Sequence, residues 1–481
     1  MAFTGISNAY ALSNLIQPYF TQGVFVQPNR SIAEFEYLSR IPGDAKAAAS
    51  REIKFNLLEG LDYRSAGMKN PGTTNFLKGY REATAEYTAT LKEFQATIEL
   101  EASLIRRAMA AKELKYDDPL AIAMTNKVIV LKRILGMYMH GDGSGRLAEV
   151  ASAAGNLAST GRLTVTLEKT GSEIGFVRHL MKNDLVSVAA PDGTPRVPSG
   201  GTLSGTFFAW RVIDRSASTI ASPTATLQAV DVNGTAVTVT AGTEASNIAD
   251  GDFFYRTAQG ITDSALGASV AASTMVFPDV SGSISDYGTL SSVFPGFESL
   301  ISGDARVVHG VTMSGSIASQ VESTGGVLDA EIQFENLLNT LKIEQGDGTW
   351  KYEEALISPA VRSALIKSGE VDRRFQARDD IHRGSRKFSY THGNDEVNLR
   401  ISEFSRDDRI WIVPSSGNGG SKVLQWHFLP FEPVKGQNGD DWHLLQSSGL
   451  LTDVMAHVTR GFGTLLNLQP SSTGVATSFT L

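Results

Sequence analysis

One long helical pattern that ends in a glycine-rich turn constrains the fold most strongly. A helix start is predicted at Asp117, Asp118 and Pro119, because an acidic residue caps free amide groups and proline fits the first helical position. Beyond it lies an apolar stripe with spacings of four and three: Met124, Val128, Leu131, Leu135 and Met139. Lys127, Lys132 and Arg133 lie off that stripe. About 20 residues that rise ~1.5 Å each predict a rod of roughly 30 Å.

The segment that follows, MHGDGSGRLAEVA (139–151), invites a nucleotide or metal interpretation that its context excludes. A phosphate-binding loop needs glycines followed by lysine and a hydroxyl residue, between a strand and a helix. Here the glycines follow a helix, and Asp142 and Ser144 are too few oxygen ligands for a calcium loop. We interpret Gly141, Gly143 and Gly145 as the residues that stop the helix and turn the chain.

Composition excludes several classes of protein. At 481 residues, with 42% hydrophobic and 20% charged residues, the chain is expected to form two or three folded lobes. The absence of cysteine excludes disulfides, thiolate nucleophiles, zinc ribbons and iron–sulfur clusters. A formal net charge of -8 argues against a DNA-reading domain, which needs a basic face.

No targeting or membrane segment is recognisable. The stretch MAFTGISNAYALSNLI lacks the basic and apolar regions of a secretory signal, and no apolar run approaches the ~18 residues of a membrane span. We therefore expect synthesis in a cytoplasm and no association with a membrane.

The first hundred residues are expected to extend away from a compact core. Residues 1–50 are broken by prolines and predict an extended arm with a short helix near its start. Residues 51–100 predict a long hairpin whose return leg, 87–100, alternates as a strand does. Its tip, 62–82, mixes turn formers with basic residues and should face solvent or a partner. A short helix is predicted at 101–112.

Later segments predict a β insertion followed by a mixed α and β region. Residues 161–280 contain strand-like runs such as FFAWRVIDR and DFFYRT, and they predict a small β-barrel or sandwich. Helices are predicted at 330–343, with a stripe of Ile332, Leu337, Leu338 and Leu341, and at 358–369, which ends in glycine. A hairpin should turn at Gly393-Asn394, and a strand is expected over 450–459.

No arrangement of residues marks an active site. The Gly-x-Ser-x-Gly and His-Glu-x-x-His signatures are absent. The most metal-like cluster lies among basic residues typical of a surface loop; it comprises Asp379, Asp380, His382, His392 and Asp395. The adjacent carboxylates Glu353-Glu354 and Asp440-Asp441 have no distinguishing spacing. The tryptophans are expected to be core anchors: Trp350, Trp411, Trp426 and Trp442. We expect no catalytic residue, no bound metal and no cofactor.

The order of these elements resembles the major capsid proteins of tailed bacteriophages, which have the Hong Kong 97-type fold. The resemblance rests on the long helix that runs into MHGDGSGRL, since the spine helix of that family is commonly followed by a GDGxG-like turn. The resemblance continues in three later segments: FPGFESLIS (294–302), the helix around Leu337, and ISPAVRSALIKSG with EVDRRF. The resemblance implies an α+β fold with these parts: N-terminal arm, 1–50; extended hairpin loop, 51–100; peripheral domain with spine helix, 101–160; inserted β-barrel or sandwich domain, 161–280; axial domain, 281–435; and return to the peripheral domain, 436–481.

The resemblance also implies a structural role and no enzymatic activity. Hexamers and pentamers of the chain would close into an icosahedral phage head around double-stranded DNA, so the protein would lie in the virion capsid after assembly in the host cytoplasm. Expected partners are further copies of the chain, portal, scaffolding and decoration proteins, and packaged DNA contacted without sequence specificity. At the hairpin tip, Arg64, Lys69, Lys78 and Arg81 are expected to contact acidic patches of a neighbouring subunit. Some family members cross-link through a lysine of this loop, where Lys69 and Lys78 lie, but we expect no cross-link here.

Three other functions remain open at the level of sequence. An encapsulin-like compartment of the same fold would enclose a protein cargo. A carbohydrate-active enzyme with a β accessory module would use the aromatic residues, but it requires two carboxylates that face each other across a cleft. A tail or decoration protein would not need the spine-helix arrangement.

Overall fold

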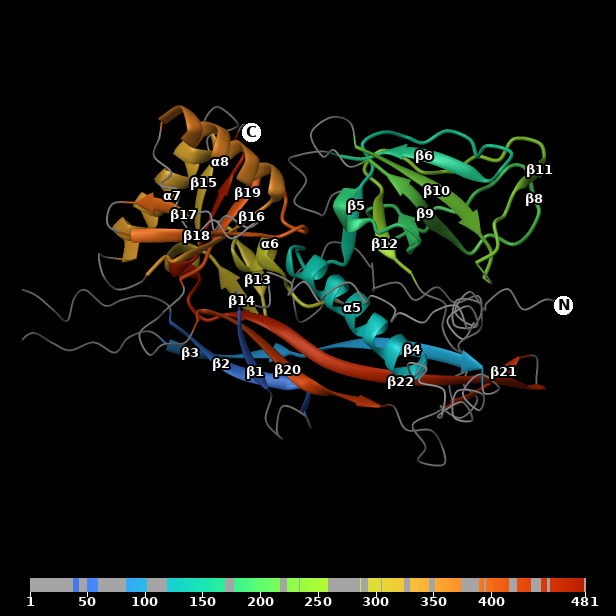
Figure 1. Cartoon of the computed structure of the whole chain (residues 1–481), viewed down its shortest axis with the longest axis horizontal. Coiled ribbons are helices and arrows are strands. Elements are labelled where there is room, and N and C mark those ends of the chain that lie inside the picture. The colour runs from blue at the N-terminus through green and yellow to red at the C-terminus, as the bar shows by residue number, and fades with distance from the viewer. Residues whose placement is uncertain are drawn as a thin grey trace, which may run out of the picture.

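The chain folds into a base sheet, a barrel and an α/β lobe, arranged around one long helix (Figure 1). In Figure 1 the base sheet runs along the bottom, with the α/β lobe at the upper left and the barrel at the upper right. The computed structural model describes these residues: 38–42, 50–58, 84–101, 119–168, 177–216, 223–232, 234–257, 286, 293–303, 305–323, 329–345, 351–372, 389–392, 395–414, 422–433, 443–447 and 450–479.

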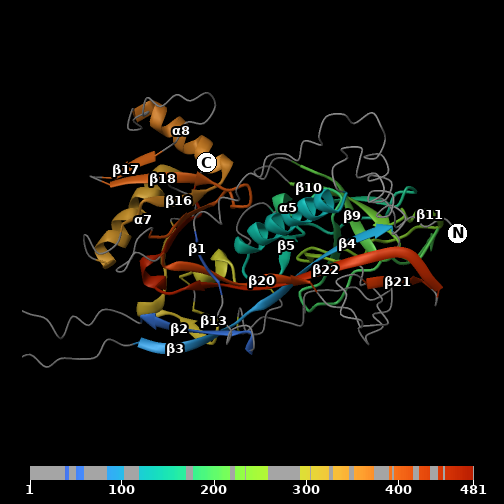
Figure 2. The same ribbon diagram turned by 60° about the horizontal axis from the view of Figure 1, so that its bottom comes forward.

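Helix α5 spans Pro119–Met139, as its start and stop signals predict. Leu131, Leu135 and Met139 are buried, which confirms this part of the apolar stripe. The side chains of Met124 and Val128 lie outside the described residues. Both views show the helix lying across the base sheet, so the rod and the sheet form two packed layers (Figure 2).

The base sheet is organised around the 18-residue strand β22 (Leu450–Asn467). The sheet order is β1 (Ser39–Pro42), β20 (Leu424–Pro433), β22 and β21 (His443–Ser447), and β4 (Lys92–Glu101) pairs with the opposite side of β22. Only β1 is parallel to its partner among these described strands. Gly463 makes room for the Trp426 indole, because a Cβ there would lie 2.4 Å from the ring. Strand β22 ends at Asn467, well past the end predicted at Thr459.

A two-stranded ribbon extends from the base sheet. Strands β2 (Glu52–Leu58) and β3 (Thr84–Thr90) are antiparallel, with Glu52 opposite Thr90 and Leu58 opposite Thr84. After Leu91 the chain continues as β4 and pairs with β22. The predicted return leg of the hairpin thus belongs first to the ribbon and then to the base sheet.

The inserted β region forms a closed barrel. Its six strands follow the order β5 (Arg146–Glu149), β12 (Phe253–Arg256), β7 (Leu185–Ala189), β9 (Ala209–Arg215), β10 (Thr224–Val230) and β6 (Arg162–Thr166). A bridge between Val150 and Leu167 joins the two outer strands, so the sheet has no open edge. The apolar interior includes Val165, Trp210 and Phe254. A small ribbon of β8 (Thr202–Leu203) and β11 (Val239–Ala241) accompanies it.

The α/β lobe has a mixed sheet buried on both faces. Its order is β15 (Gln320–Ser323), β23 (Gly474–Thr477), β19 (Arg409–Ile412), β16 (Glu354–Ile357), β18 (Asp395–Ile401) and β17 (Ser389–His392). Ile357 and Ile410 pack in a core with helices α7 (Ala330–Gln345) and α8 (Pro359–Asp372). Leu356 and Trp411 alternate with them and belong to a second core shared with α5 and the base sheet. This shared core joins the two lobes.

Short elements connect the lobes. They are the 3₁₀ turns η3 (Val177–His179), η5 (Gly315–Ile317) and η6 (Pro470–Ser472), helix α6 (Phe297–Leu300), and the hairpin of β13 (Arg306–Val308) and β14 (Val311–Met313).

Several sequence-based boundaries differ from the structure. The barrel begins at Arg146 instead of 161, because the first residues after the turn pair with β12. Ile332 is 46% exposed, and Phe334 takes its place in the core. Helix α8 continues through Gly369 to Asp372. Strand β20 already belongs to the base sheet before 436, and β23 returns to the α/β lobe. The hairpin around 393–394 is confirmed, since His392 lies opposite Asp395. The helix expected at 101–112 lies outside the described residues after Glu101.

Candidate functional site

The turn after α5 is buried and satisfies its own polar groups. The Asp142 carboxylate accepts hydrogen bonds from the backbone N–H and the hydroxyl of Ser144, at 2.8 and 2.5 Å. The Ser144 hydroxyl accepts one from the N–H of Arg146 at 3.2 Å. Gly143 and Gly145 have φ values of +91° and +79°, which favour glycine. The polar atoms of the turn thus direct the chain from α5 into β5.

The segment before α6 lies directly on this turn. A Cβ on Gly296 would lie 2.2 Å from the carbonyl oxygen of Gly141, and a Cβ on Gly143 would lie 3.1 Å from the Cα of Pro295. The rings of Phe297 and His140 meet edge to face with centroids 5.0 Å apart. The two glycines therefore permit a contact of backbone on backbone that fixes α6 to the end of α5.

Residues 402–409, SEFSRDDR, form the point where the lobes meet and are termed the junction segment. The Ser402 hydroxyl lies 3.1 Å from Nε2 of His140, at the end of α5. The Phe404 carbonyl accepts a hydrogen bond of 3.0 Å from Nε2 of His179, in the η3 turn of the barrel. Arg178 Nη2 donates to both carboxylate oxygens of Asp407 at 2.9 Å. The segment thus contacts the end of α5 and the barrel at once.

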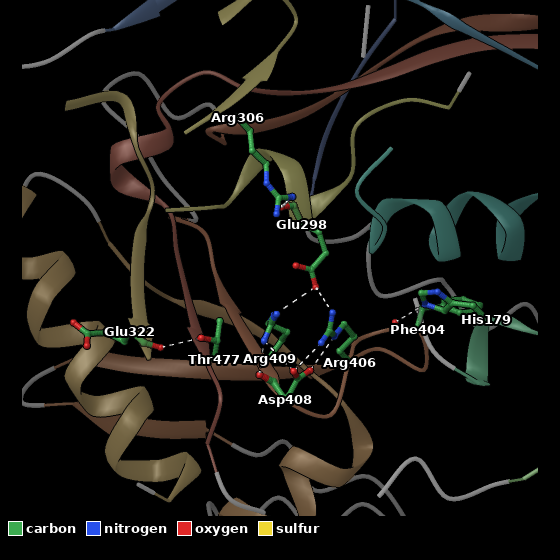
Figure 3. Close-up of polar contacts among 9 residues, drawn as sticks. All are labelled: His179, Glu298, Arg306, Glu322, Phe404, Arg406, Asp408, Arg409 and Thr477. Carbon is green, nitrogen blue, oxygen red and sulfur yellow. Dashed lines mark hydrogen bonds and ion pairs between the residues drawn. The ribbon is translucent and has the colours of Figure 1, made fainter. Parts of the chain in front are cut away.

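A buried cluster of charges joins the junction segment to α6 (Figure 3). Glu298 lies 3.6 Å from Arg406 and 3.5 Å from Arg409. Asp408 pairs with the same two arginines, at 2.8 and 3.0 Å. Arg306 donates to the Glu298 carbonyl oxygen at 3.2 Å. Two acids and two arginines therefore neutralise one another away from water, which is how buried charges are tolerated.

The two carboxyls of the cluster respond differently to this environment. Burial raises the pKa of Glu298, and the nearby Arg409 and Arg406 oppose that rise only in part. Burial also disfavours the charge on Asp408, but Arg406 and Arg409 outweigh it and lower the pKa of Asp408. Because the side chains are almost fully covered, this arrangement suits a structural cluster better than a site that binds substrate.

Two buried histidines hold other elements in place. Burial lowers the pKa of His179 to about 3 and the pKa of His309 to about 4. His309 lies at the tip of the β13–β14 hairpin, donates from Nε2 to the Leu465 carbonyl at 3.2 Å, and contacts the ring of Phe55 on β2. Both rings are therefore neutral at physiological pH, and His309 fixes the inner end of the ribbon to β22.

The hairpin-tip residues expected to contact a neighbour, Arg64, Lys69, Lys78 and Arg81, lie outside the described residues. The β2–β3 ribbon, which flanks them in the sequence, is described. Phe55 and Ala89 face the core, whereas Lys54 and Glu86 form an exposed ion pair of 2.5 Å on the other face. The contact assigned to the tip stays a prediction.

Residues considered for metal or acid–base chemistry do not converge in the described part of the chain. No group of three or more His, Asp or Glu side chains there could hold a metal ion. Glu354 is paired with Arg400 at 2.6 Å and Lys422 at 3.6 Å. Trp411 and Trp426 are buried, as predicted. The positions outside the described residues, or with side chains outside them, are Trp350, Asp379, Asp380, His382, His392, Asp395, Asp440, Asp441 and Trp442. Among the described helices, none is long and apolar enough to cross a membrane.

Comparison with known proteins gives matches among solved structures. No protein-family model and no curated protein matches the chain. The Cyanophage A-1(L) capsid asymmetric unit matches at 8% identity with a TM-score of 0.43, covering 92% of this chain and 92% of that chain. The capsid of Ralstonia phage GP4 matches at 9% identity with a TM-score of 0.37, covering 96% of each. The chain resembles phage capsid structures.

Another kind of particle matches over a smaller part of the chain. A virus-like particle from Pyrococcus furiosus is 16% identical with a TM-score of 0.19, over 33% of this chain and 54% of that chain. The phage capsids are the class of protein that the order of elements and MHGDGSGRL indicated from the sequence.

The junction segment is the part of the site that sequence reasoning missed. Its charged residues look like those of a solvated loop, yet all of 402–409 except Glu403 is buried. One signal was present: SRDDR stands immediately before the apolar run IWIV, with no glycine or proline between them. A charge-dense stretch that leads directly into a buried strand is a reason to expect buried ion pairs.

Proposed function

We propose that the chain is the structural subunit of a phage-type shell, in which hexamers and pentamers close into an icosahedral head around double-stranded DNA. The observation that carries this proposal is the β2–β3 ribbon. Among the described strands each pairs only with the other, so the ribbon has two open edges. One face of the ribbon packs on the subunit's own core through Phe55 and Ala89, whereas its two open edges suit contact with a neighbour.

The packing of the rest of the subunit suits the wall of a shell that must resist mechanical force. Helix α5 and the base sheet form two stacked layers, and one apolar core continues from them into the α/β lobe through Trp411 and Trp426. Packed interiors have low compressibility and transmit strain. In this proposal the α/β lobe corresponds to an axial domain and the base sheet with α5 to a peripheral domain.

The proposed partners follow from this role. Further copies of the chain are the principal partner, and portal, scaffolding and decoration proteins complete the particle in the virion. The formal net charge of -8 suits a wall that confines DNA without binding it tightly. The function is structural, and no catalytic step is assigned to it.

An encapsulin-like shell of the same fold is the second candidate, which the order of elements in the sequence leaves open. The contents of purified particles separate the two. Nuclease-protected DNA supports a phage head, whereas a co-purifying protein cargo without DNA supports a compartment.

The assembly role of the hairpin tip can be tested by replacing Arg64, Lys69, Lys78 and Arg81 together with alanine. Each charge contributes little alone, since exposed ion pairs are worth about 0–1 kcal/mol, but the loss should be cumulative over many copies. We expect shells to be lost while the stability of the free subunit stays within about 0.5 kcal/mol of the parent. Sedimentation and urea unfolding measure the two properties. Exposed Lys132 and Lys182, changed to alanine, serve as the control. Normal shells from the quadruple variant would exclude this role.

A further inference from the structure

The η3 turn is a rigid extension of the barrel that reaches the junction segment. Arg215, on β9, donates to the Val177 carbonyl at 2.9 Å and so ties η3 to the barrel wall. The next two residues, Arg178 and His179, both contact the junction segment. A displacement of the barrel would therefore act directly on Asp407 and Phe404.

Two kinds of contact hold the barrel at this point. Phe404 packs in the barrel core together with Met137 of α5, and such apolar contact is strong but has no preferred direction. The Arg178–Asp407 pair is a charge-assisted contact in which Nη2 lies 2.9 Å from both carboxylate oxygens. Together with the hydrogen bond from His179 Nε2 to the Phe404 carbonyl, this pair sets the orientation of the barrel.

The chain enters and leaves the barrel at one place. Arg146 on β5, the first strand, lies opposite Tyr255 on β12, the last strand. The preceding turn contains Gly143 and Gly145 with positive φ. The barrel is therefore attached through two adjacent strands, beside a turn that is itself packed against Pro295.

The inner and outer charges of the junction differ in their access to water. The side chains of Arg406 and Asp408 are 5% and 11% exposed, and those of Arg178 and Asp407 are 19% and 5% exposed, so only the arginine end of the outer pair reaches water. On the barrel side, the Arg215 guanidinium donates to the Val177 carbonyl, the residue directly before Arg178.

We propose that the Arg178–Asp407 ion pair is a latch that fixes the barrel in one orientation relative to the α/β lobe. Opening the latch widens the range of orientations of the barrel relative to the α/β lobe, while both lobes remain folded and the α5–β5 turn stays packed on Pro295. The barrel and the α/β lobe are coupled mechanically at the junction segment, through this ion pair, the His179–Phe404 hydrogen bond and the packing of Phe404. This conformational device is a property of the single chain and does not depend on shell formation.

The absence of cysteine allows a direct test by spin labelling. Val197 in the barrel is 46% exposed and Ile343 on α7 is 79% exposed, so Val197→Cys with Ile343→Cys places one label on each lobe of the full chain. Labelled chains diluted into unlabelled chains give the distance within one chain by pulsed electron spin resonance, whether or not subunits assemble. The parent should give one narrow distribution, and Asp407→Asn should broaden it at least twofold.

The matched control is Glu403→Gln, which breaks the ion pair of Glu403 with Arg133 at 3.4 Å in the same segment. Both of those side chains are more than half exposed, and the distribution should stay narrow. Arg178→Gln breaks the latch from the barrel side and should reproduce the broadening. A parent-like distribution in both latch variants would overturn the proposal. So would loss of fold by circular dichroism in both variants, since the proposal requires both lobes to stay folded when the ion pair is broken.

Discussion

Gly296 shows how a single residue can determine where two elements meet. Its Cα faces three carbonyl oxygens at the end of α5, and a Cβ would lie 2.2 to 2.7 Å from them. Those oxygens belong to backbone, so they cannot move aside as a flexible side chain could. The FPG sequence, residues 294–296, is therefore a packing surface.

Replacing Gly296 with alanine should destabilise the subunit by on the order of 3 kcal/mol, because overpacking forces the backbone to shift. Gly155→Ala is the matched control, since Gly155 has nothing within 4 Å of its Cβ position and is exposed. Urea unfolding of both variants measures the difference. Equal midpoints for the two would show that α6 does not depend on close contact with α5.

His309 should make stability depend on pH. Its folded-state pKa is about 4, below the ordinary value of 6.5, so the unfolded chain takes up this proton first as pH falls. The contribution is complete above about pH 6.5, is lost between pH 6.5 and pH 4, and amounts to on the order of 3 kcal/mol. His309→Asn can keep the left-handed backbone at φ 53° and removes the titration. Its unfolding free energy should be lower at pH 7 but less dependent on pH; an unchanged slope would argue against a buried neutral ring.

At the scale of elements, helix α5 connects separate cores. Leu135 is buried in the core shared by the base sheet and the α/β lobe, whereas Met137 belongs to the barrel core. Adjacent faces of one helix thus anchor three lobes. Substitutions on this helix should therefore alter the packing of lobes that lie far from the substituted residue.

Leu135→Ala should lower stability by about 2–5 kcal/mol, the usual range for a leucine deleted from a packed interior. Val130→Ala on the same helix removes a side chain that is 42% exposed and should change stability by no more than about 0.5 kcal/mol. Chemical unfolding compares them directly. A small effect of Leu135→Ala would mean that α5 rests loosely on the sheet.

Local sequence patterns predicted where helices and strands lie better than they predicted which of these elements pair or pack together. Pro119 and the glycines after Met139 bound α5 correctly because capping is a local property of the chain. The end of α8 was missed at Gly369, where the cost of glycine in a helix is small enough to be offset by other interactions. Closure of the barrel at Val150 and Leu167, and the ion pairs of the junction segment with residues far away in sequence, are long-range contacts that no local periodicity encodes.

At the scale of the molecule, the three lobes do not behave as separate domains. The core around Trp411 and Trp426 continues from the base sheet into the α/β lobe, and the junction segment ties the barrel to both. The ribbon differs from the lobes in that its two edges are unpaired among the described strands, although Phe55 and Ala89 pack on the subunit's own core. Unpaired edges of this kind suit a subunit that contacts further copies of itself on assembly.

Electron microscopy of the chain expressed alone tests this assignment most directly. The account predicts closed shells of uniform size, or rings of six and five subunits, with the ribbon of each copy lying on the next. Monodisperse monomers, with the fold retained by circular dichroism, would contradict it.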